Sequence, residues 1–175
     1  MSTSGAFGGR EYESRDHLLR PLSAAEAAAL GAEMAATDPW ARLGFSADGL
    51  AGALAPRERI APESPVTFGL EGLGGALAGA VSVRPVWLRG PYLALLFVRP
   101  QSQSRGTGLA ALEWMEAEAG RAGANSLWTA VSAFNDRAFS FYRRFGFEEV
   151  ALLPDLVMPG EDERLLRKPL RVAVP

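Results

Sequence analysis

The sequence predicts a single mixed α/β domain in which the strands are mostly antiparallel. In the middle of the chain, strand-like runs follow one another across Gly-rich or Arg-Gly-Pro turns, over residues 66–70, 76–84 and 92–98. Such runs separated by short turns are typical of an antiparallel meander. A helical pattern over residues 108–122 then precedes another strand-like run, residues 126–131. Because a helix joins them, the strands 92–98 and 126–131 can pair in parallel through a right-handed crossover.

Two helices are predicted before the meander. Ser23 followed by Glu26 matches a capping box, and the alanine-rich run over residues 24–36 has a high intrinsic helix propensity. The helix should end before Pro39, because a proline disfavours helical geometry in the residue before it. Ser46 can cap a second, shorter helix that extends to about residue 55.

After residue 131 the pattern predicts one more helix and two final strands. Asn135 can cap the helix, and Gly146 ends it. The final strands are expected over residues 147–157 and 163–170, on either side of the turn 159–162. The apolar stripe of the helix repeats at helical spacing and consists of Ala138, Phe141, Tyr142 and Phe145.

The chain shows no internal repeat and no second core. We therefore expect residues 10–175 to form one domain. Residues 1–9 are mainly small, so we expect a disordered N-terminal lead-in there. Residues 12–20 are expected to form the first strand.

Composition excludes several classes of function. The chain has 175 residues, no cysteine, one histidine and a net charge of −2. A chain without cysteine has no disulfide framework and no thiolate nucleophile. The single histidine, His17, excludes a multi-histidine metal site, so no metal is expected. Nucleic acid is not an expected partner, because no basic run exceeds a pair of residues. With no apolar signal segment or membrane span, we expect a cytoplasmic protein that does not bind membranes.

The most informative motif is the glycine-bearing turn between residue 98 and the helix 108–122. Its residues are Gln103, Ser104, Arg105, Gly106, Thr107 and Gly108. A strand that runs into a glycine turn and then a helix presents backbone N–H groups to a phosphate-bearing ligand. Gly106 and Gly108 lack the Cβ atoms that would hold a diphosphate away, and Arg105 can add a charge-assisted contact. The turn therefore predicts a nucleotide-like cofactor.

A dinucleotide is disfavoured as that cofactor. Residues 99–105 separate the strand from the first glycine, whereas the dinucleotide fingerprint places the glycine almost directly after the strand. No acidic residue occurs over residues 125–133 to hold a ribose. A meander also precedes the turn instead of alternating strands and helices. An NAD(P)-dependent oxidoreductase remains only as a competing hypothesis.

Two motifs together resemble those of the GNAT superfamily of N-acetyltransferases. Those proteins carry Gln/Arg-x-x-Gly-x-Gly/Ala after a Val-x-Pro, and here Val98-Arg99-Pro100 precedes the turn 103–108. They also carry Asn-x-x-Ala-x-x-x-Tyr followed by Gly-Phe. The matching residues of this chain are Asn135, Ala138, Tyr142, Gly146 and Phe147.

The resemblance implies a fold, a cofactor and a reaction. The fold would be a central, mostly antiparallel sheet of about seven strands, with a splayed parallel pair in the middle and four flanking helices. The reaction would move an acetyl group from acetyl-CoA to a primary amine, on a small molecule or a peptide N-terminus, by direct attack in a ternary complex. The Val98 N–H would stabilise charge on the thioester oxygen, and Tyr142 would donate a proton to the departing thiolate. The implied cofactor-binding residues are Phe97, Val98, Gln103, Ser104, Arg105, Gly106, Thr107, Gly108, Asn135, Ala138, Phe141 and Arg144.

The acceptor side is less determined by the sequence. Relatives often carry an acidic residue on the fourth strand, but residues 93–97 contain no carboxylate. Asp38 and Glu71 are candidate bases, and Asp38 and Trp40 lie in a connection that would border the acceptor groove. The missing carboxylate also leaves open a non-catalytic acyl-CoA binding or sensing domain. A homodimer is allowed as well, because the last strands of relatives can pair between subunits.

Overall fold

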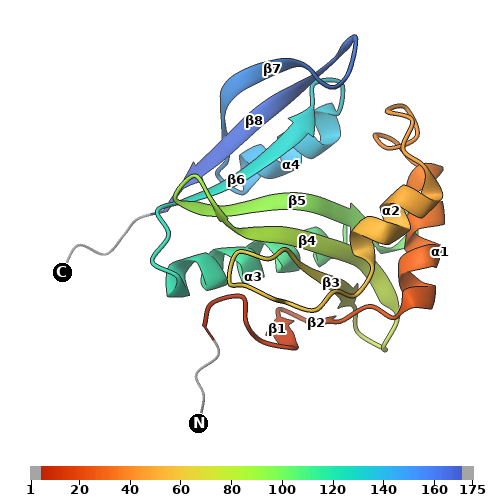
Figure 1. Cartoon of the computed structure of the whole chain (residues 1–175), viewed down its shortest axis with the longest axis vertical. Coiled ribbons are helices and arrows are strands. Elements are labelled where there is room, and N and C mark those ends of the chain that lie inside the picture. The colour runs from red at the N-terminus through yellow and green to blue at the C-terminus, as the bar shows by residue number, and fades with distance from the viewer. Residues whose placement is uncertain (1–4, 171–175) are drawn as a thin grey trace.

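One eight-stranded sheet forms the centre of the structure, a computed structural model that describes residues 5–170 (Figure 1). The strand order is β1-β2-β3-β4-β5-β6-β8-β7. Neighbouring strands are antiparallel except β5 and β6, which are parallel. The strands are β1 (Tyr12–Ser14), β2 (His17–Arg20), β3 (Val66–Glu71), β4 (Leu77–Trp87), β5 (Gly90–Val98), β6 (Ser126–Ser132), β7 (Glu148–Met158) and β8 (Glu161–Pro169). The helices are α1 (Ala24–Ala35), α2 (Ala47–Leu54), the short 3-10 helix η1 (Pro100–Ser102), α3 (Thr107–Arg121) and α4 (Asp136–Arg144).

This architecture confirms the predicted mixed α/β fold with a parallel pair inside a mostly antiparallel sheet. The predicted helix starts are confirmed as well, because Ser23 and Ser46 cap α1 and α2 with their side chains. Residues 1–4 of the expected lead-in and residues 171–175 of the expected domain lie outside the described residues. No helix within residues 5–170 is both long and apolar enough to cross a membrane.

The N-terminal segment differs from expectation in two ways. Residues 12–20 form a hairpin of β1 and β2 instead of one strand, so the described sheet has eight strands. Arg15 takes a left-handed conformation at the turn, with a φ of 52°. Gly or Asn usually occupies such a position, and neither is present here to indicate a turn. Within the expected lead-in, Phe7 is 2% exposed and packs edge-on against Trp114 of α3.

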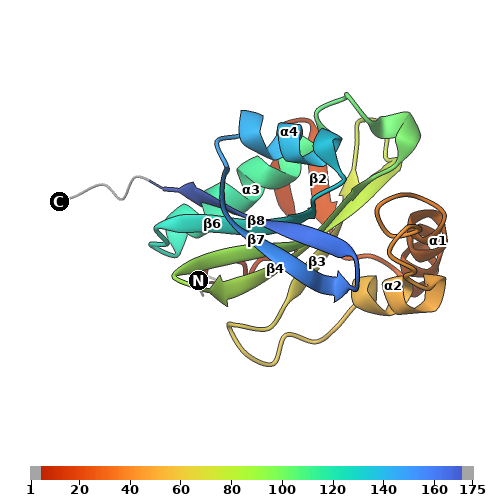
Figure 2. The same cartoon turned by 90° about the horizontal axis from the view of Figure 1, so that it is seen from above.

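The two faces of the sheet carry separate cores. Helices α3 and α4 cover one face, and α1 and α2 cover the other (Figure 2). On the α3 side, Leu112 and Met115 pack on strand residues such as Val81. On the α1 side, Leu30 packs with residues that include Phe97 of β5. Because β5 contributes to both cores, its position is fixed from both faces.

The parallel strands β5 and β6 separate after a short paired stretch. They pair only at Tyr92 with Trp128 and at Leu93 with Thr129. The register between β4 and β5 shifts near the same point, and a bulge of this kind bends a strand. Beyond Thr129, β6 continues its pairing with β8 alone. The diverging ends of β5 and β6 therefore leave an open notch in the middle of the sheet, which we call the β5–β6 gap.

Candidate active site

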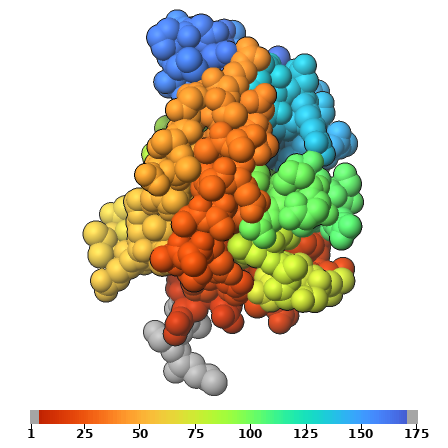
Figure 3. All heavy atoms as spheres, turned by 90° about the vertical axis from the view of Figure 1, so that its right-hand side faces the viewer, coloured from red at the N-terminus to blue at the C-terminus, as the bar shows by residue number. Residues whose placement is uncertain are grey.

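Two pockets meet at the β5–β6 gap. The first, the loop pocket, has a volume of about 400 Å³ and lies between the end of β5, the η1–α3 turn and α4. The second, the strand pocket, has a volume of about 230 Å³ and is lined mainly by β5, β6 and parts of β7 and β8. Figure 3 shows the contributing segments gathered on one side of the molecule: the connection after α1 (orange), the segment after β5 (green), the start of α4 (cyan) and the β7–β8 turn (blue). Both pockets share the residues Pro39, Trp40, Leu96, Asn135, Ala138 and Tyr142.

The loop pocket contains most of the residues that the sequence motifs single out. Arg105 and Glu71 line neither pocket. The predicted residues that line the loop pocket are Asp38, Trp40, Phe97, Val98, Gln103, Ser104, Gly106, Thr107, Gly108, Asn135, Ala138, Phe141, Tyr142 and Arg144.

The η1–α3 turn has the backbone geometry of an anion site. Gly106 is the N-cap of α3, with a φ of 83°, and no side chain caps the helix there. The N–H groups of the first turn of a helix have no partner within the helix, so they can bind an anion. A Cβ on Gly108 would lie 3.0 Å from Cζ of Phe141, so this glycine also lets α4 pack closely. The Thr107 hydroxyl faces inward, where it contacts Nε2 of His17 at 2.9 Å, so Thr107 can offer a ligand its backbone but not its hydroxyl.

Strand β5 offers unpaired main-chain groups to the gap. The N–H of Arg99 donates to the carbonyl of Ala78 on β4 at 2.9 Å. In an antiparallel ladder the next pair, Gly79 with Val98, does not exchange hydrogen bonds, so the N–H and carbonyl of Val98 point away from β4. The same alternation turns the groups of Leu96 toward the gap. These groups can pair with an extended ligand as an added strand would.

This geometry separates Phe97 from Val98, the two strand residues that were expected to bind the cofactor. Phe97 and Arg99 direct their polar groups toward β4, so Leu96 and Val98 are the residues that can bind a ligand in the gap. The Gln103 side chain folds back, and its Nε2 donates to the Val98 carbonyl at 3.2 Å. This bond engages the Val98 carbonyl and leaves the Val98 N–H available to a ligand in the gap.

Tyr142 lies where the two pockets join. It is 7% exposed, and its ring packs against Phe141 and Phe147. Burial raises the pKa of the phenol above its ordinary value, and Thr129 opposes this shift in part. The phenol is therefore protonated at neutral pH and can act as a proton donor. Asn135 positions α4, the helix that carries Tyr142, because the Asn135 Oδ1 accepts from the N–H of Ala138 at 3.1 Å.

The strand pocket contains a carboxylate that the sequence analysis missed. Glu163 of β8 is 6% exposed, and its Oε1 accepts from the Ser132 hydroxyl at 2.6 Å. Burial raises the pKa of Glu163, the charge of Glu161 adds to this effect, and the Ser132 hydrogen bond opposes it. Glu163 faces the gap because of the β6–β8 register, in which it lies opposite Ser132. No local pattern in the sequence specifies that register.

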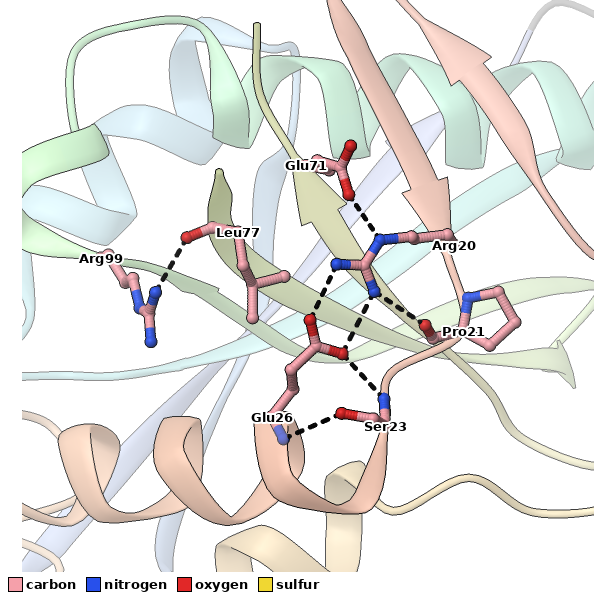
Figure 4. Close-up of polar contacts among 7 residues, drawn as sticks. All are labelled: Arg20, Pro21, Ser23, Glu26, Glu71, Leu77 and Arg99. Carbon is pink, nitrogen blue, oxygen red and sulfur yellow. Dashed lines mark hydrogen bonds and ion pairs between the residues drawn. The ribbon is translucent and has the colours of Figure 1, made fainter. Parts of the chain in front are cut away.

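The candidate acceptor residues are placed apart from one another. Trp40 lines both pockets and packs edge-on against Phe97. Asp38 lines only the loop pocket, and its Oδ1 accepts from the N–H of Arg42 at 3.2 Å. Glu71 lies on β3, outside the lining of both pockets, and its Oε2 accepts from Nε of Arg20 at 2.5 Å (Figure 4). Glu71 is therefore not in reach of a ligand in the gap.

No group of three or more His, Asp or Glu side chains within residues 5–170 is arranged to hold a metal ion.

Comparison with solved structures places the whole architecture among acetyltransferases. The ribosomal-protein-S18-alanine N-acetyltransferase from Escherichia coli is 24% identical, with a TM-score of 0.66 over 90% of this chain and 96% of that chain. Nourseothricin acetyltransferase is 30% identical, with a TM-score of 0.58 over 63% of this chain and 67% of that chain. An acetyltransferase from Bacillus anthracis is 12% identical, with a TM-score of 0.58 over 69% of this chain and 68% of that chain. Its structure contains acetyl coenzyme A.

The sequence also matches a family directly. The match covers residues 35–147, which include both pocket-forming motifs and more than half of the chain. The chain belongs to the Acetyltransferase (GNAT) family.

Proposed function

We propose that this protein is an N-acetyltransferase that moves the acetyl group of acetyl-CoA to a primary amine by direct attack in a ternary complex. The observation that carries the proposal is the meeting of two pockets at Tyr142 in the β5–β6 gap. One pocket would hold the acetyl donor and the other the amine, so the two substrates would react where the pockets join. A small-molecule amine and a peptide N-terminus both remain candidate acceptors.

The residues of the loop pocket fit acetyl-CoA. The N–H groups at the start of α3 suit its diphosphate, and Gly106 adds no Cβ at that point. Arg144 also lines this pocket and supplies a positive charge. The main-chain groups of Leu96 and the carbonyl of Val98, which face the gap, suit the amides of the pantetheine arm, which would extend along β5.

Two groups support the chemical step. The N–H of Val98 can donate to the thioester oxygen, where negative charge develops during attack. Tyr142 can donate its proton to the departing thiolate, because burial keeps the phenol protonated. Neither role requires a covalent bond to the protein.

Replacing the phenol tests this assignment. In Tyr142→Phe, turnover should fall about 100-fold because the thiolate loses its positioned acid. Affinity for acetyl-CoA should not change, since the ring remains. Thiol release measures turnover, and calorimetry measures the affinity. Tyr12→Phe is the matched control, because the Tyr12 hydroxyl accepts from the Gly9 N–H and Tyr12 lines neither pocket.

Unchanged turnover in Tyr142→Phe would remove Tyr142 from the mechanism. If the wild-type protein bound acetyl-CoA but released no thiol with any amine, an acyl-CoA binding or sensing domain would replace the proposed enzyme. Preferential binding of NAD(P) would instead favour the oxidoreductase hypothesis.

A further inference from the structure

We propose that the strand pocket binds the amine acceptor, that Glu163 holds its ammonium group and takes its proton, and that the acceptor is an amine with one positive charge and an apolar body. This inference rests on the N-acetyltransferase function proposed above. It follows from the lining of the pocket, the environment of Glu163 and the exposed apolar rim.

Glu163 is the only charged side chain that lines the strand pocket within the described residues 5–170. The polar groups beside it are hydroxyls and one amide, and the remaining wall is apolar. A single carboxylate in such a wall can neutralise one ammonium group. A second positive charge in the pocket would lose its hydration without gaining a partner, which is costly. The apolar wall includes Trp40, Leu43, Phe45, Tyr92, Leu156 and Val157.

The Glu163 carboxylate is held in place but keeps one oxygen free of described partners. Ser132 donates to Oε1, and within residues 5–170 no side chain donates to Oε2. No Arg, Lys or His of the described residues forms an ion pair with it. A buried carboxylate without a cation is unfavourable, so binding an ammonium group there would supply its missing partner.

The groups around Glu163 favour proton transfer from that ammonium. Tyr92 of β5 and Tyr142 of α4 face the same pocket as neutral phenols, while Ser132 of β6 donates a hydrogen bond. Glu161, on the same strand, adds negative charge and is itself paired with Arg42 at 2.7 Å. Burial raises the pKa of Glu163, and the same burial lowers the pKa of a bound amine. The two pKa values approach each other, which makes Glu163 a suitable base.

The proton balance of the reaction is complete with these groups. The ammonium nitrogen gives one proton to Glu163, which releases it to solvent. The neutral nitrogen then forms the C–N bond as the C–S bond breaks, and Tyr142 gives its proton to the thiolate. The second nitrogen proton restores the Tyr142 phenol. The products are the amide, the free thiol and one proton in solution.

The rim of the strand pocket is apolar and exposed. Phe45, Leu156 and Val157 are large apolar side chains with exposures of 42%, 57% and 42%, and all of them line this pocket. They come from the α1–α2 connection and from β7. Exposed apolar groups that converge on one pocket mark a ligand-binding surface. The body of a bound acceptor would cover them.

The first test compares two amines on the wild-type protein, so it does not depend on any variant. Hexylamine and 1,6-diaminohexane have the same chain length and differ in the second charge. With acetyl-CoA in excess, kcat/KM measured by thiol release should favour hexylamine by at least about tenfold. Equal use of both amines, or a preference for the diamine, would overturn the inferred acceptor class. If diamines or peptides were acetylated but hexylamine was not, the proposed N-acetyltransferase function would stand and this inference would fail. If none of the amines tested supported thiol release, both the proposed N-acetyltransferase function and this inference would be overturned.

The second test uses Glu163→Gln, with Glu148→Gln as the matched control on the exposed start of β7. Glu163→Gln should lower kcat/KM for hexylamine about 100-fold at neutral pH, because the base is lost. The deficit in kcat/KM relative to the wild type should shrink as pH rises toward the amine pKa, since a larger share of the amine is then neutral before it binds. The Kd for acetyl-CoA should match that of the wild type. A variant with unchanged kcat/KM, or a deficit that is constant with pH, would overturn the assignment of Glu163 as the base.

Ser132→Ala provides a milder variant with its own signature. The Ser132 hydrogen bond favours the carboxylate form of Glu163. Its loss should raise the Glu163 pKa and move the acidic limb of the kcat/KM profile to higher pH. A limb that stays in place, or moves to lower pH, would contradict the role of Glu163.

Discussion

Burial affects Tyr142 and Glu163 in the same direction and thereby prepares them for opposite tasks. Both side chains are less than a tenth exposed, and burial raises the pKa of each. For Tyr142 this keeps the proton that the thiolate would need. For Glu163 it increases the affinity of the carboxylate for a proton from the amine. Two buried residues that line the strand pocket can therefore serve as acid and base.

Gly106 is the residue on which the proposed anion site at α3 depends most directly. Gly106→Ala should weaken binding of acetyl-CoA about tenfold, because a Cβ enters the loop pocket at a backbone position with φ of 83°. It should also lower the free energy of unfolding by about 1 kcal/mol, the cost of a left-handed non-glycine residue. Calorimetry gives the Kd, and urea unfolding gives the stability.

The matched control is Gly120→Ala within α3, where a Cβ would meet nothing within 4 Å. Alanine should stabilise that helix by about 0.5–1 kcal/mol and leave the Kd unchanged. An unchanged Kd in Gly106→Ala would show that the diphosphate binds elsewhere.

Local patterns in the sequence identify one half of the candidate site and miss the other. The turn 103–108 and the segment 135–142 carry their spacing within a short stretch, and the structure brings both to the loop pocket. Glu163 has no such local pattern, because its place in the gap depends on pairing between β6 and β8. Glu71 lines neither pocket, and its partner Arg20 likewise becomes its neighbour only through the β2–β3 pairing.

At the scale of elements, the start of α1 is tied to the sheet by a network around Arg20 (Figure 4). Arg20 bonds Glu26 with two nitrogens, at 2.8 and 3.1 Å, and bonds Glu71 of β3 with Nε. Glu26 also accepts from the Ser23 N–H at 2.8 Å, which completes the capping box. The network therefore fixes the angle at which the chain leaves β2 and enters α1.

This network predicts a loss of stability in acid. Hydrogen bonds from Arg20 and from the Ser23 backbone lower the pKa of Glu26 to about 2, from an ordinary value of 4.5. Because the folded-state pKa is the lower one, the stabilisation is fully present above pH 4.5 and disappears as pH falls toward 2. Glu26→Gln should reduce the free energy of unfolding by about 1–2 kcal/mol at neutral pH, after allowance for solvent screening of a partly exposed pair.

The pH dependence of urea unfolding is the measurement. Below pH 4.5 the difference between the wild type and Glu26→Gln should narrow. Glu63→Gln, an exposed carboxylate in the α2–β3 connection, is the control and should track the wild type. If the difference in the free energy of unfolding stayed constant below pH 4.5, the charge of Glu26 would contribute nothing to stability.

Elements with a strong local signal were predicted correctly, and those with a weak signal were not. The caps Ser23, Ser46 and Asn135 were correctly placed because a cap depends on residues within one helical turn. The β1–β2 hairpin was read as a single strand, because its turn uses Arg15 in place of glycine or asparagine. Phe7 was expected to be disordered because small residues surround it in the sequence. Its place in the core depends on tertiary packing against Trp114.

At the scale of the whole molecule, the candidate site depends on the packing of one sheet between two layers of helices. The α3 side fixes β6 and α4 in one core, and the α1 side fixes the end of β5 in the other. The ladder between β5 and β6 stops after Leu93 and Thr129, so each layer holds one wall of the gap. The loop pocket and the strand pocket thus meet at one break in the sheet.

The most direct test of this arrangement is a crystal structure of the full chain with CoA bound. We expect the diphosphate on the N–H groups at residues 103–108, the pantetheine arm beside Leu96 and Val98, and the thiol near the Tyr142 hydroxyl. A diphosphate bound elsewhere, or a thiol that points away from the β5–β6 gap, would contradict it.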